Sequence, residues 1–337
     1  MIRFDYARPT DLAEALREGA GEEVAYLAGG TNLVDLLKEN VARPTRVVDI
    51  ARLPLTGIED TAQGGLRLGA LATNTETAYD QRVQARYPLL SSALLAGATA
   101  QLRNAATNGG NINQRTRCYY FYDVATPCNK REPGQGCAAI GGVSRIHAIL
   151  GTSHQCIATH PSDMAVALAA LKAEVRVTGP GGDRVIAFAD YHRLPGDEPW
   201  RDTTLEPGEL VTAIDLPPES FPTNFTYLKL RERLSYAFAL VSVAVAMRLE
   251  GERIAEVRIA LGGVAHKPWR RPEAEDLLRG QEPGREAFGA AADALLEGAR
   301  GQGGNDFKVP MARKAILRAL EQATAGTPQS QTDKRIA

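Results

Sequence analysis

The four cysteines of this chain, Cys118, Cys128, Cys137 and Cys156, all lie in one short stretch of its 337 residues. Four thiols gathered in this way are the usual ligand count of a metal ion or an iron–sulfur cluster, which makes the chain wrap around one point. The gaps between successive cysteines are nine, eight and eighteen residues, so the stretch has no C-x-x-C pair. It therefore matches neither the zinc-ribbon pattern nor the bacterial ferredoxin run. Spacing alone leaves a metal site and two structural disulfides equally open.

The residues between the cysteines favour the metal site. Glycine, proline and charged residues follow Cys128 and precede Cys137. This composition predicts an irregular loop that can wrap a cluster and point backbone N–H groups at its sulfurs. Arg117, Lys130 and Arg131 could offset the negative charge of four thiolates, and the alternative is that they are ordinary solvated bases.

Histidines lie in or just after the same stretch: His147, His154, His160 and, farther on, His192. Imidazole can replace a thiolate as a ligand, but the four cysteines already complete a set.

The overall charge excludes several classes of partner. A net charge of −1 gives no reason to expect binding to nucleic acid or to an anionic membrane. No apolar run approaches the ~20 residues that span a bilayer. The first residues have no basic region followed by an apolar one, so they do not form a secretory signal. We expect the chain to fold in the cytoplasm and, if it is exported to the periplasm, to leave only within a complex whose partner carries the signal.

Two glycine-rich segments predict a phosphate-bearing cofactor. The first, residues 28–33, follows an apolar strand at 24–27 and precedes a helix, an order that lets backbone N–H groups face a pyrophosphate. It is not G-x-G-x-x-G, and alone it would be read as an ordinary turn. The second, residues 103–112, supplies another glycine turn directly before the cysteines. Ser162 or Asp163 is the expected N-cap of a helix at 164–172, which is compatible with a contact to a ribose hydroxyl.

The remaining pattern predicts an α+β chain. We expect a hairpin over 175–188 and a strand at 210–216 that ends at a Pro-Pro pair, the predicted domain boundary. Three strand-like segments and three helical ones then indicate a small second domain, and the last dozen residues are expected to be disordered. The expected elements of this domain are strands at 226–230, 239–249 and 254–261, and helices at 273–278, 285–300 and 309–322.

Together these segments resemble, over nearly the whole chain, the FAD-binding medium subunits of the molybdenum hydroxylases, the family that includes xanthine dehydrogenase and carbon monoxide dehydrogenase. The resemblance implies a vanillyl-alcohol-oxidase-type (PCMH-type) FAD-binding domain of two subdomains over 1–218. It also implies a C-terminal flavoprotein domain of three strands plus helices over 223–324, followed by a polar tail at 325–337.

The residues that carry the resemblance, and that it implies for FAD binding, are Leu27, Ala28, Gly29, Gly30, Thr31, Asn32 and Leu33, then Thr107, Gly109, Gly110 and Asn111, then Ser162 and Asp163, then Leu210 and Val211, and finally Lys229. In the family the first two sets wrap the pyrophosphate and the Ser-Asp pair holds the adenosine ribose. The Leu-Val pair makes apolar contacts with FAD. Lys229 falls where a lysine contacts the flavin, and there it would stabilise the anionic reduced form. No catalytic residue is implied.

Most of that family lacks a four-cysteine insertion, which here covers about residues 115–158. Two subgroups have one and hold a [4Fe–4S] cluster in it: 4-hydroxybenzoyl-CoA reductases and bacterial aldehyde oxidoreductases of the PaoABC type, to which this chain looks closer. The resemblance thus implies that Cys118, Cys128, Cys137 and Cys156 ligate a [4Fe–4S] cluster, either structural or a side branch of the electron path. It also implies a heterotrimer with a molybdenum-cofactor large subunit and a [2Fe–2S] small subunit. Electrons from an aldehyde would pass through the FAD to an external acceptor.

Two rival interpretations remain at this stage. An independent flavin oxidase of the same fold would need a catalytic base over the flavin, and the sequence offers no convincing candidate. A scaffold protein with a structural four-cysteine zinc site would leave the two glycine turns and Ser162-Asp163 unexplained.

Overall fold

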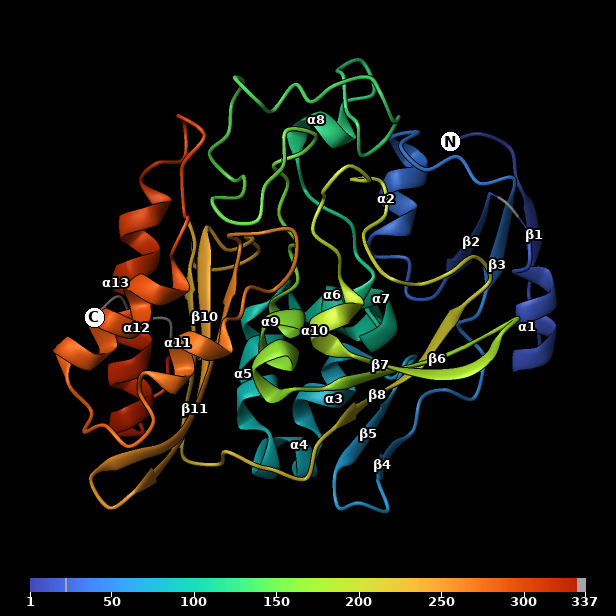
Figure 1. The fold of residues 1–337 in the computed structure, drawn as a ribbon. Helices are drawn as coiled ribbons and strands as arrows, with labels where there is room; N and C mark the ends of the chain where they lie inside the picture. The colour runs from blue at the N-terminus through green and yellow to red at the C-terminus, as the bar shows by residue number, and fades with distance from the viewer. Residues whose placement is uncertain (22, 332–337) are drawn as a thin grey trace.

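The structure, a computed structural model, describes residues 1–21 and 23–331. Its strands form three sheets, with helices packed between and around them (Figure 1). The first two sheets and their helices lie in the N-terminal two thirds of the chain, and the third sheet belongs to the C-terminal third. The chain passes from β8 (Leu210–Leu216) to β9 (Asn224–Leu230) through the segment that holds the Pro-Pro pair.

The first sheet is small and parallel, in the order β1-β3-β2. Helix α1 (Leu12–Glu18) connects its first two strands, and the Asp11 side chain caps that helix by accepting from the Glu14 N–H at 2.7 Å. Helix α2 (Leu33–Lys38) follows the second strand. The strands are β1 (Asp5–Ala7), β2 (Val24–Leu27) and β3 (Arg46–Asp49). This unit places the first glycine segment at the carboxyl end of β2.

The second sheet has five strands in the order β4-β5-β8-β6-β7, all antiparallel to their neighbours. On its central strand, Asp215 accepts hydrogen bonds from Arg67 and Arg176 on the two flanking strands, at 2.8 and 2.6 Å. The other strands are β4 (Ile58–Asp60), β5 (Leu66–Gly69), β6 (Glu174–Gly179) and β7 (Gly182–Ala187). The helices of this region are α3 (Asn74–Tyr79), α4 (Gln81–Arg86), α5 (Pro88–Ala96), α6 (Ala100–Ala105), α7 (Asn108–Ile112), α9 (Asp163–Leu171) and α10 (Phe188–Tyr191).

The third sheet is antiparallel, in the order β11-β10-β9, and lies between two layers of helices (Figure 1). The alternation of the long central strand explains this, because Val243 and Val245 belong to the apolar cluster under α13 while Ala244 and Ala246 belong to the cluster under α5 and α9. The small side chains Ala244 and Ala246 face the N-terminal part of the chain and let its helices pack closely against this sheet. The remaining elements are β10 (Val241–Glu250), β11 (Arg253–Gly262), α11 (Pro272–Asp276), α12 (Arg285–Leu295) and α13 (Lys308–Ala325).

Residues 113–162 form a long irregular segment across one end of the molecule, at the top of Figure 1. Its one helix is α8 (Tyr119–Tyr122). The C-terminal part of the chain holds this segment in place: Asn305 Nδ2 and Lys308 Nζ both donate to the His147 carbonyl, at 2.9 and 2.8 Å. The predicted irregular cysteine loop is therefore confirmed.

Most of the predicted elements are confirmed, including the 175–188 hairpin and the strands and helices of the C-terminal third. Two predictions are wrong. Residues 103–112 do not form an open glycine turn, because Thr99 and Thr107 cap two short helices there, α6 and α7. The tail is not free as far as it is described: the Gln329 N–H donates to Thr226 and the Gln331 side chain to the Tyr227 carbonyl, at 3.1 Å each. Residues 332–337 of the predicted tail lie outside the described residues.

Candidate cofactor sites

The first glycine segment is a tight loop that lies against the α6–α7 turn. A Cβ on Gly29 would sit 1.8 Å from the Ala105 carbonyl oxygen, so the approach requires glycine. Gly30 has a φ of +72°, which also favours glycine. Within the described residues, the backbone N–H groups of Gly29, Gly30 and Thr31 have no hydrogen-bond partner. Consecutive free N–H groups between a strand and a helix are what a pyrophosphate needs.

The second glycine segment contributes shape more than free donors. Thr107 caps α7 by accepting from the Gly110 N–H at 3.2 Å, and the Gly109 N–H donates to the Ala70 carbonyl at 2.7 Å. The Asn111 side chain donates to Asn74 at 2.6 Å. Most of the N–H groups expected to face a phosphate are thus used within the chain. Gly110 remains exposed, so this turn presents bare backbone to the surface beside the first segment.

Ser162 and Asp163 lie next to α7. Ser162 is the N-cap of α9, accepting from the Ala165 N–H at 2.9 Å, and its hydroxyl donates to Asn111 Oδ1 at 2.6 Å. The third predicted FAD segment therefore contacts the second. Asp163 is engaged differently: one carboxylate oxygen accepts from Lys229 Nζ and the other from the Tyr227 hydroxyl, both at 2.7 Å.

Lys229 is a buried cation, with 1 % of its side chain exposed. Besides Asp163 it donates to the Ala96 carbonyl at 3.1 Å, which also accepts from Arg231 at 2.9 Å. Lys229 is therefore not a surface lysine. Asp163 and Lys229, which are predicted to contact different parts of FAD, thus form an ion pair with each other in this structure.

Leu210 and Val211 begin β8 and are buried in two different apolar clusters. Leu210 packs in the cluster that includes Ala28 of the first segment, and Val211 belongs to the large central core. The five predicted FAD segments are therefore linked one to the next, from the loop after β2 through α7 and α9 to β9, with Leu210 packed against the first of them.

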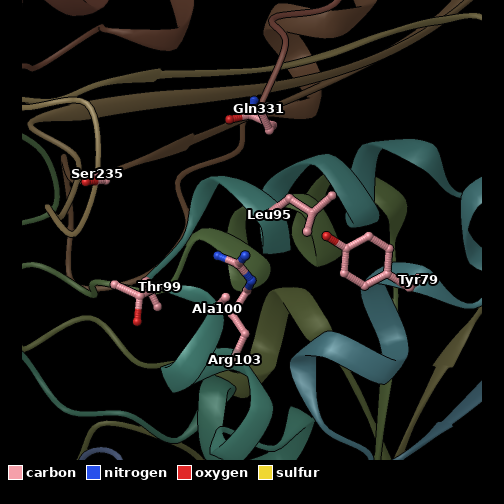
Figure 2. Close-up of a pocket in the computed structure, with 8 residues that line it drawn as sticks. Tyr79, Leu95, Thr99, Ala100, Arg103, Ser235 and Gln331 are labelled. Atoms are coloured by element: carbon pink, nitrogen blue, oxygen red, sulfur yellow. The ribbon is translucent and has the colours of Figure 1, made fainter. Parts of the chain in front are cut away.

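A cavity of about 250 Å³ lies between α5, α6 and the loop from β9 to β10 (Figure 2). The Arg103 guanidinium points toward its middle, and its buried Nε atom has no hydrogen-bond partner among the described residues. Arg103 Nη1 donates to the Gly97 carbonyl at 2.7 Å, next to the Ala96 carbonyl that binds Lys229. The cavity is lined by Tyr79, Leu95, Ala98, Thr99, Ala100, Arg103, Ser235 and Gln331. Sequence reasoning missed it, because its walls come from segments as far apart in the chain as Tyr79 and Gln331.

The four cysteines converge. All four are free thiols; Cys118, Cys128 and Cys156 are buried and Cys137 is half-buried, and all lie in or against one apolar cluster that includes Phe121. Cys128 and Cys137 face each other in an isolated β-bridge. Among the described residues, no group of three or more His, Cys, Asp or Glu side chains is placed so that it could hold a metal ion. The structure thus gathers the thiols without forming a finished metal site.

Backbone N–H groups point at three of the sulfurs, as predicted. Cys118 accepts from Tyr120 and Phe121, although burial still raises the pKa of its thiol to about 12. A hydrogen bond from Cys156 lowers the pKa of Cys137 to about 6, with help from the N–H groups of residues 139, 140 and 157. The same bond, together with burial, raises the pKa of Cys156. The hydrogen bond between the two thiols thus favours the thiolate, the form that binds metals, at Cys137 over Cys156.

The nearby bases and histidines have distinct roles. Lys130 is buried, and its charge opposes the rise in the pKa of Cys156. Arg131 instead donates to the carbonyls of residues 120, 121, 123 and 126 and so holds the loop together. Arg117 bonds the Tyr122 hydroxyl at 2.9 Å. His147 Nε2 lies 3.1 Å from Cys118 Sγ, whereas His154 is exposed.

Two family models match the chain. "FAD binding domain in molybdopterin dehydrogenase" matches residues 2–219, and "CO dehydrogenase flavoprotein C-terminal domain" matches residues 226–323. The chain belongs to the FAD-binding subunits of the molybdenum hydroxylases. The predicted family and its FAD-binding fold of mixed helix and sheet are therefore confirmed.

Several relatives of this FAD-binding subunit cover it almost completely. It is 48 % identical to the aldehyde oxidoreductase FAD-binding subunit PaoB of Escherichia coli, over 96 % of this chain and 99 % of that protein. It is 30 % identical to the carbon monoxide dehydrogenase medium chain of Hydrogenophaga pseudoflava, over 96 % and 98 %. A solved structure of carbon monoxide dehydrogenase from the same organism superposes with a TM-score of 0.75 at 29 % identity, covering 97 % of this chain and 99 % of that one.

The comparisons do not test the individual site residues, which remain predictions. Within residues 1–21 and 23–331, no helix is both long and apolar enough to cross a membrane.

Proposed function

We propose that this chain is the FAD- and [4Fe–4S]-carrying electron-transfer subunit of a molybdenum-containing aldehyde oxidoreductase, which converts an aldehyde to a carboxylic acid. The observation that carries the substrate class is the 48 % identity, over 96 % of this chain, to a protein named as the FAD-binding subunit of an aldehyde oxidoreductase. The partners would be a large subunit with the molybdenum cofactor and a small subunit with [2Fe–2S] clusters. Relatives named as medium chains support such an assembly.

FAD would be held along the five predicted segments, which contact one another in sequence from the loop after β2 to β9. The free N–H groups of Gly29, Gly30 and Thr31 would donate to the pyrophosphate, and exposed Gly110 would allow its close approach. Asp163 would reach a ribose hydroxyl with the acceptor capacity left by its two present donors.

The flavin end would lie toward the cavity beside Lys229. When bound, FAD accepts and returns electrons singly or in pairs, so it can link one-electron centres to a two-electron acceptor. In the cavity wall, Arg103 Nε is a buried donor that finds no acceptor among residues 1–21 and 23–331. A buried donor of this kind is costly unless a ligand satisfies it. The features of this chain that favour FAD are thus the N–H groups of the loop after β2 and the buried Arg103 donor in the cavity wall.

The [4Fe–4S] cluster would be ligated by the four cysteines. The support is the chemistry of the donor set: free thiols in one apolar cluster, backbone N–H groups aimed at three sulfurs, and a thiolate favoured at Cys137. The buried charge of Lys130 would offset part of the negative charge of the cluster. These features fit an iron–sulfur centre better than two disulfides, since hydrogen bonds to sulfur tune such centres.

The first test is the visible spectrum of the chain purified without oxygen, recorded before and after dithionite. Flavin bands over broad iron–sulfur absorption, both bleaching, support the proposal, and iron analysis then gives the stoichiometry. Flavin bands with zinc or no metal refute the cluster and leave the FAD site. A colourless chain, also when co-expressed with its partner subunits, refutes both cofactors.

The ligand assignment is tested by Cys128→Ser, with Val143→Ser as the control. Val143 lies in the same segment but is 65 % exposed, so the control introduces the same residue without removing a thiol. We expect Cys128→Ser to lose iron and Val143→Ser to keep it. Full iron content in Cys128→Ser would contradict the assignment.

The aldehyde assignment is tested in the assembled complex. Anaerobic addition of an aldehyde such as benzaldehyde should bleach the flavin bands of this subunit. If a 4-hydroxybenzoyl-CoA-type substrate exchanges electrons with the flavin and aldehydes do not, the chain belongs to the other subgroup that carries the insertion.

A further inference from the structure

A partly buried ion-pair cluster lies between the two candidate cofactor sites and was not predicted. Its centre is Asp202, in the segment between α10 and β8. One carboxylate oxygen accepts from Arg115 Nε at 2.7 Å, and the other accepts from Lys130 Nζ. The exposed fractions of the three side chains are 28 %, 30 % and 1 %, in the order Asp202, Arg115, Lys130. Burial opposes ionisation here, yet Lys130 and Arg115 hold the pKa of Asp202 well below its usual range.

Arg115 connects this cluster to the predicted FAD site. It follows α7 closely, and its backbone N–H donates to the Asn32 side chain at 2.8 Å. Asn32 belongs to the first glycine segment and immediately precedes α2. The position of Arg115 therefore fixes the loop whose free N–H groups face the pyrophosphate site.

Lys130 connects the cluster to the cysteines. It lies two residues after Cys128, and Nζ also donates to the Pro199 carbonyl at 2.7 Å. The adjacent Asn129 accepts from the Gly136 N–H at 2.7 Å and donates to the Gln155 carbonyl at 3.1 Å, so it ties together the residues before Cys137 and Cys156. Anchoring Lys130 therefore anchors the turn on which three of the four cysteines depend.

The other titratable groups around Asp202 are the histidines His160, His192 and His266. Burial lowers the pKa of each, that of His192 to about 4, so all three are neutral at pH 7. The charge inside the cluster is then one carboxylate against two cations. Removing Asp202 would leave both cations without their common partner, and both would have to move or bind water.

We infer that Asp202 is a positioning residue that couples the two cofactor sites, holding the FAD loop through Arg115 and the cysteine loop through Lys130. The inference rests on the proposed function, because it needs both cofactors on this chain. Its consequence is asymmetric: losing Asp202 weakens both sites, whereas losing either cation weakens mainly the site on its own side.

The test compares Asp202→Asn with Asp197→Asn, a change of the same type in the same loop at a side chain that is 87 % exposed. Each variant is purified without oxygen as the complex with its partner subunits. After size exclusion, FAD and the iron in excess of that in the partner's [2Fe–2S] clusters are counted per folded chain. We expect Asp202→Asn to weaken FAD binding about tenfold and to lower the iron content, since a charge-assisted hydrogen bond is lost on each side. Asp202→Glu should restore most of both, and Asp197→Asn should match the wild type.

Two further variants separate coupling from general loss of structure. Arg115→Met should lose mainly FAD affinity, and Lys130→Met mainly iron. In the Asp202→Asn chains that keep a cluster, its reduction potential should rise, because an uncompensated Lys130 stabilises the more negative reduced form.

Parallel loss of both cofactors in all three charge-removing variants, or an unchanged potential, would show a purely structural role and overturn the inference. FAD and iron contents equal to those of the wild type in Asp202→Asn would also overturn the inference, but they would leave the proposed function intact. A wild-type chain without iron would overturn the cluster, and the coupling with it.

Discussion

Replacing Lys229 with Met should destabilise the chain by about 3 kcal/mol even before FAD is considered. The ammonium and the Asp163 carboxylate are 2.7 Å apart, with 1 % and 10 % of their side chains exposed. Removing one partner of a buried pair costs about 3–5 kcal/mol, because the other charge stays buried. Here the lower end applies. Asp163 keeps the Tyr227 hydroxyl as a donor, and the Ala96 carbonyl keeps Arg231.

The assay is a double-mutant cycle measured by urea unfolding of the full chain without added FAD. The four proteins are the wild type, Lys229→Met, Asp163→Asn and the double variant, with Lys314→Met, at an exposed lysine of α13, as the control. The double variant buries no unpaired charge, so its loss should fall short of the sum of the single losses by at least about 1.5 kcal/mol. Additive losses, or a Lys229→Met variant as stable as the control, would refute the buried pair.

Two further predictions concern the FAD loop and the C-terminal helix. Gly29→Ala should abolish FAD binding, because its Cβ would sit 1.8 Å from the Ala105 carbonyl oxygen. The control Gly181→Ala, where a Cβ meets nothing within 4 Å, should bind FAD normally. Flavin fluorescence titration measures both affinities, and equal values would contradict the loop geometry. Burial lowers the pKa of Lys308 from 10.5 to about 7. Above pH 7 the folded chain therefore binds fewer protons at this lysine than the unfolded chain does. The free energy of unfolding should rise by roughly 2–3 kcal/mol between pH 7 and pH 9 as a result. Urea unfolding at both pH values should show this rise in the wild type and not in Lys308→Met; the same rise in both proteins would exclude Lys308 as its source.

The parts of this fold that could be predicted depend on short-range pattern. The alternation of valine and alanine over residues 243–246 of β10 is visible in a short window of sequence, because strand side chains repeat every two positions. The hairpin of β6 and β7 follows from two apolar runs around a glycine-rich turn. The gathering of the thiols was predictable for a similar reason, since all four lie in one irregular segment. The family resemblance then linked the glycine segments that lie far apart.

What escaped prediction depends on contacts between distant residues that share no pattern. Asp202 is 72 residues from Lys130 and 87 from Arg115, in a stretch whose composition indicates only a loop. The ion pair between Asp163 and Lys229 could not be predicted, because the resemblance implies a contact with FAD for each residue and no contact between the two. Helix α7 escapes prediction because its two glycines are poor helix formers, while the Thr107 side chain that caps its first turn leaves no mark in the hydrophobic pattern.

The hydrogen bonds from the C-terminal part of the chain to the cysteine segment have a consequence during synthesis. The His147 carbonyl is held by Asn305 and Lys308, which leave the ribosome 158 and 161 residues later. At a translation rate of ~5–20 residues per second, the cysteine segment lacks these two hydrogen bonds for roughly 10–30 s after it has been made. The two contacts that fix the His147 end of the cysteine segment therefore form last, long after the thiols and the residues they pack against have been made. A ribosome that stalls before Asn305 would leave the segment without them.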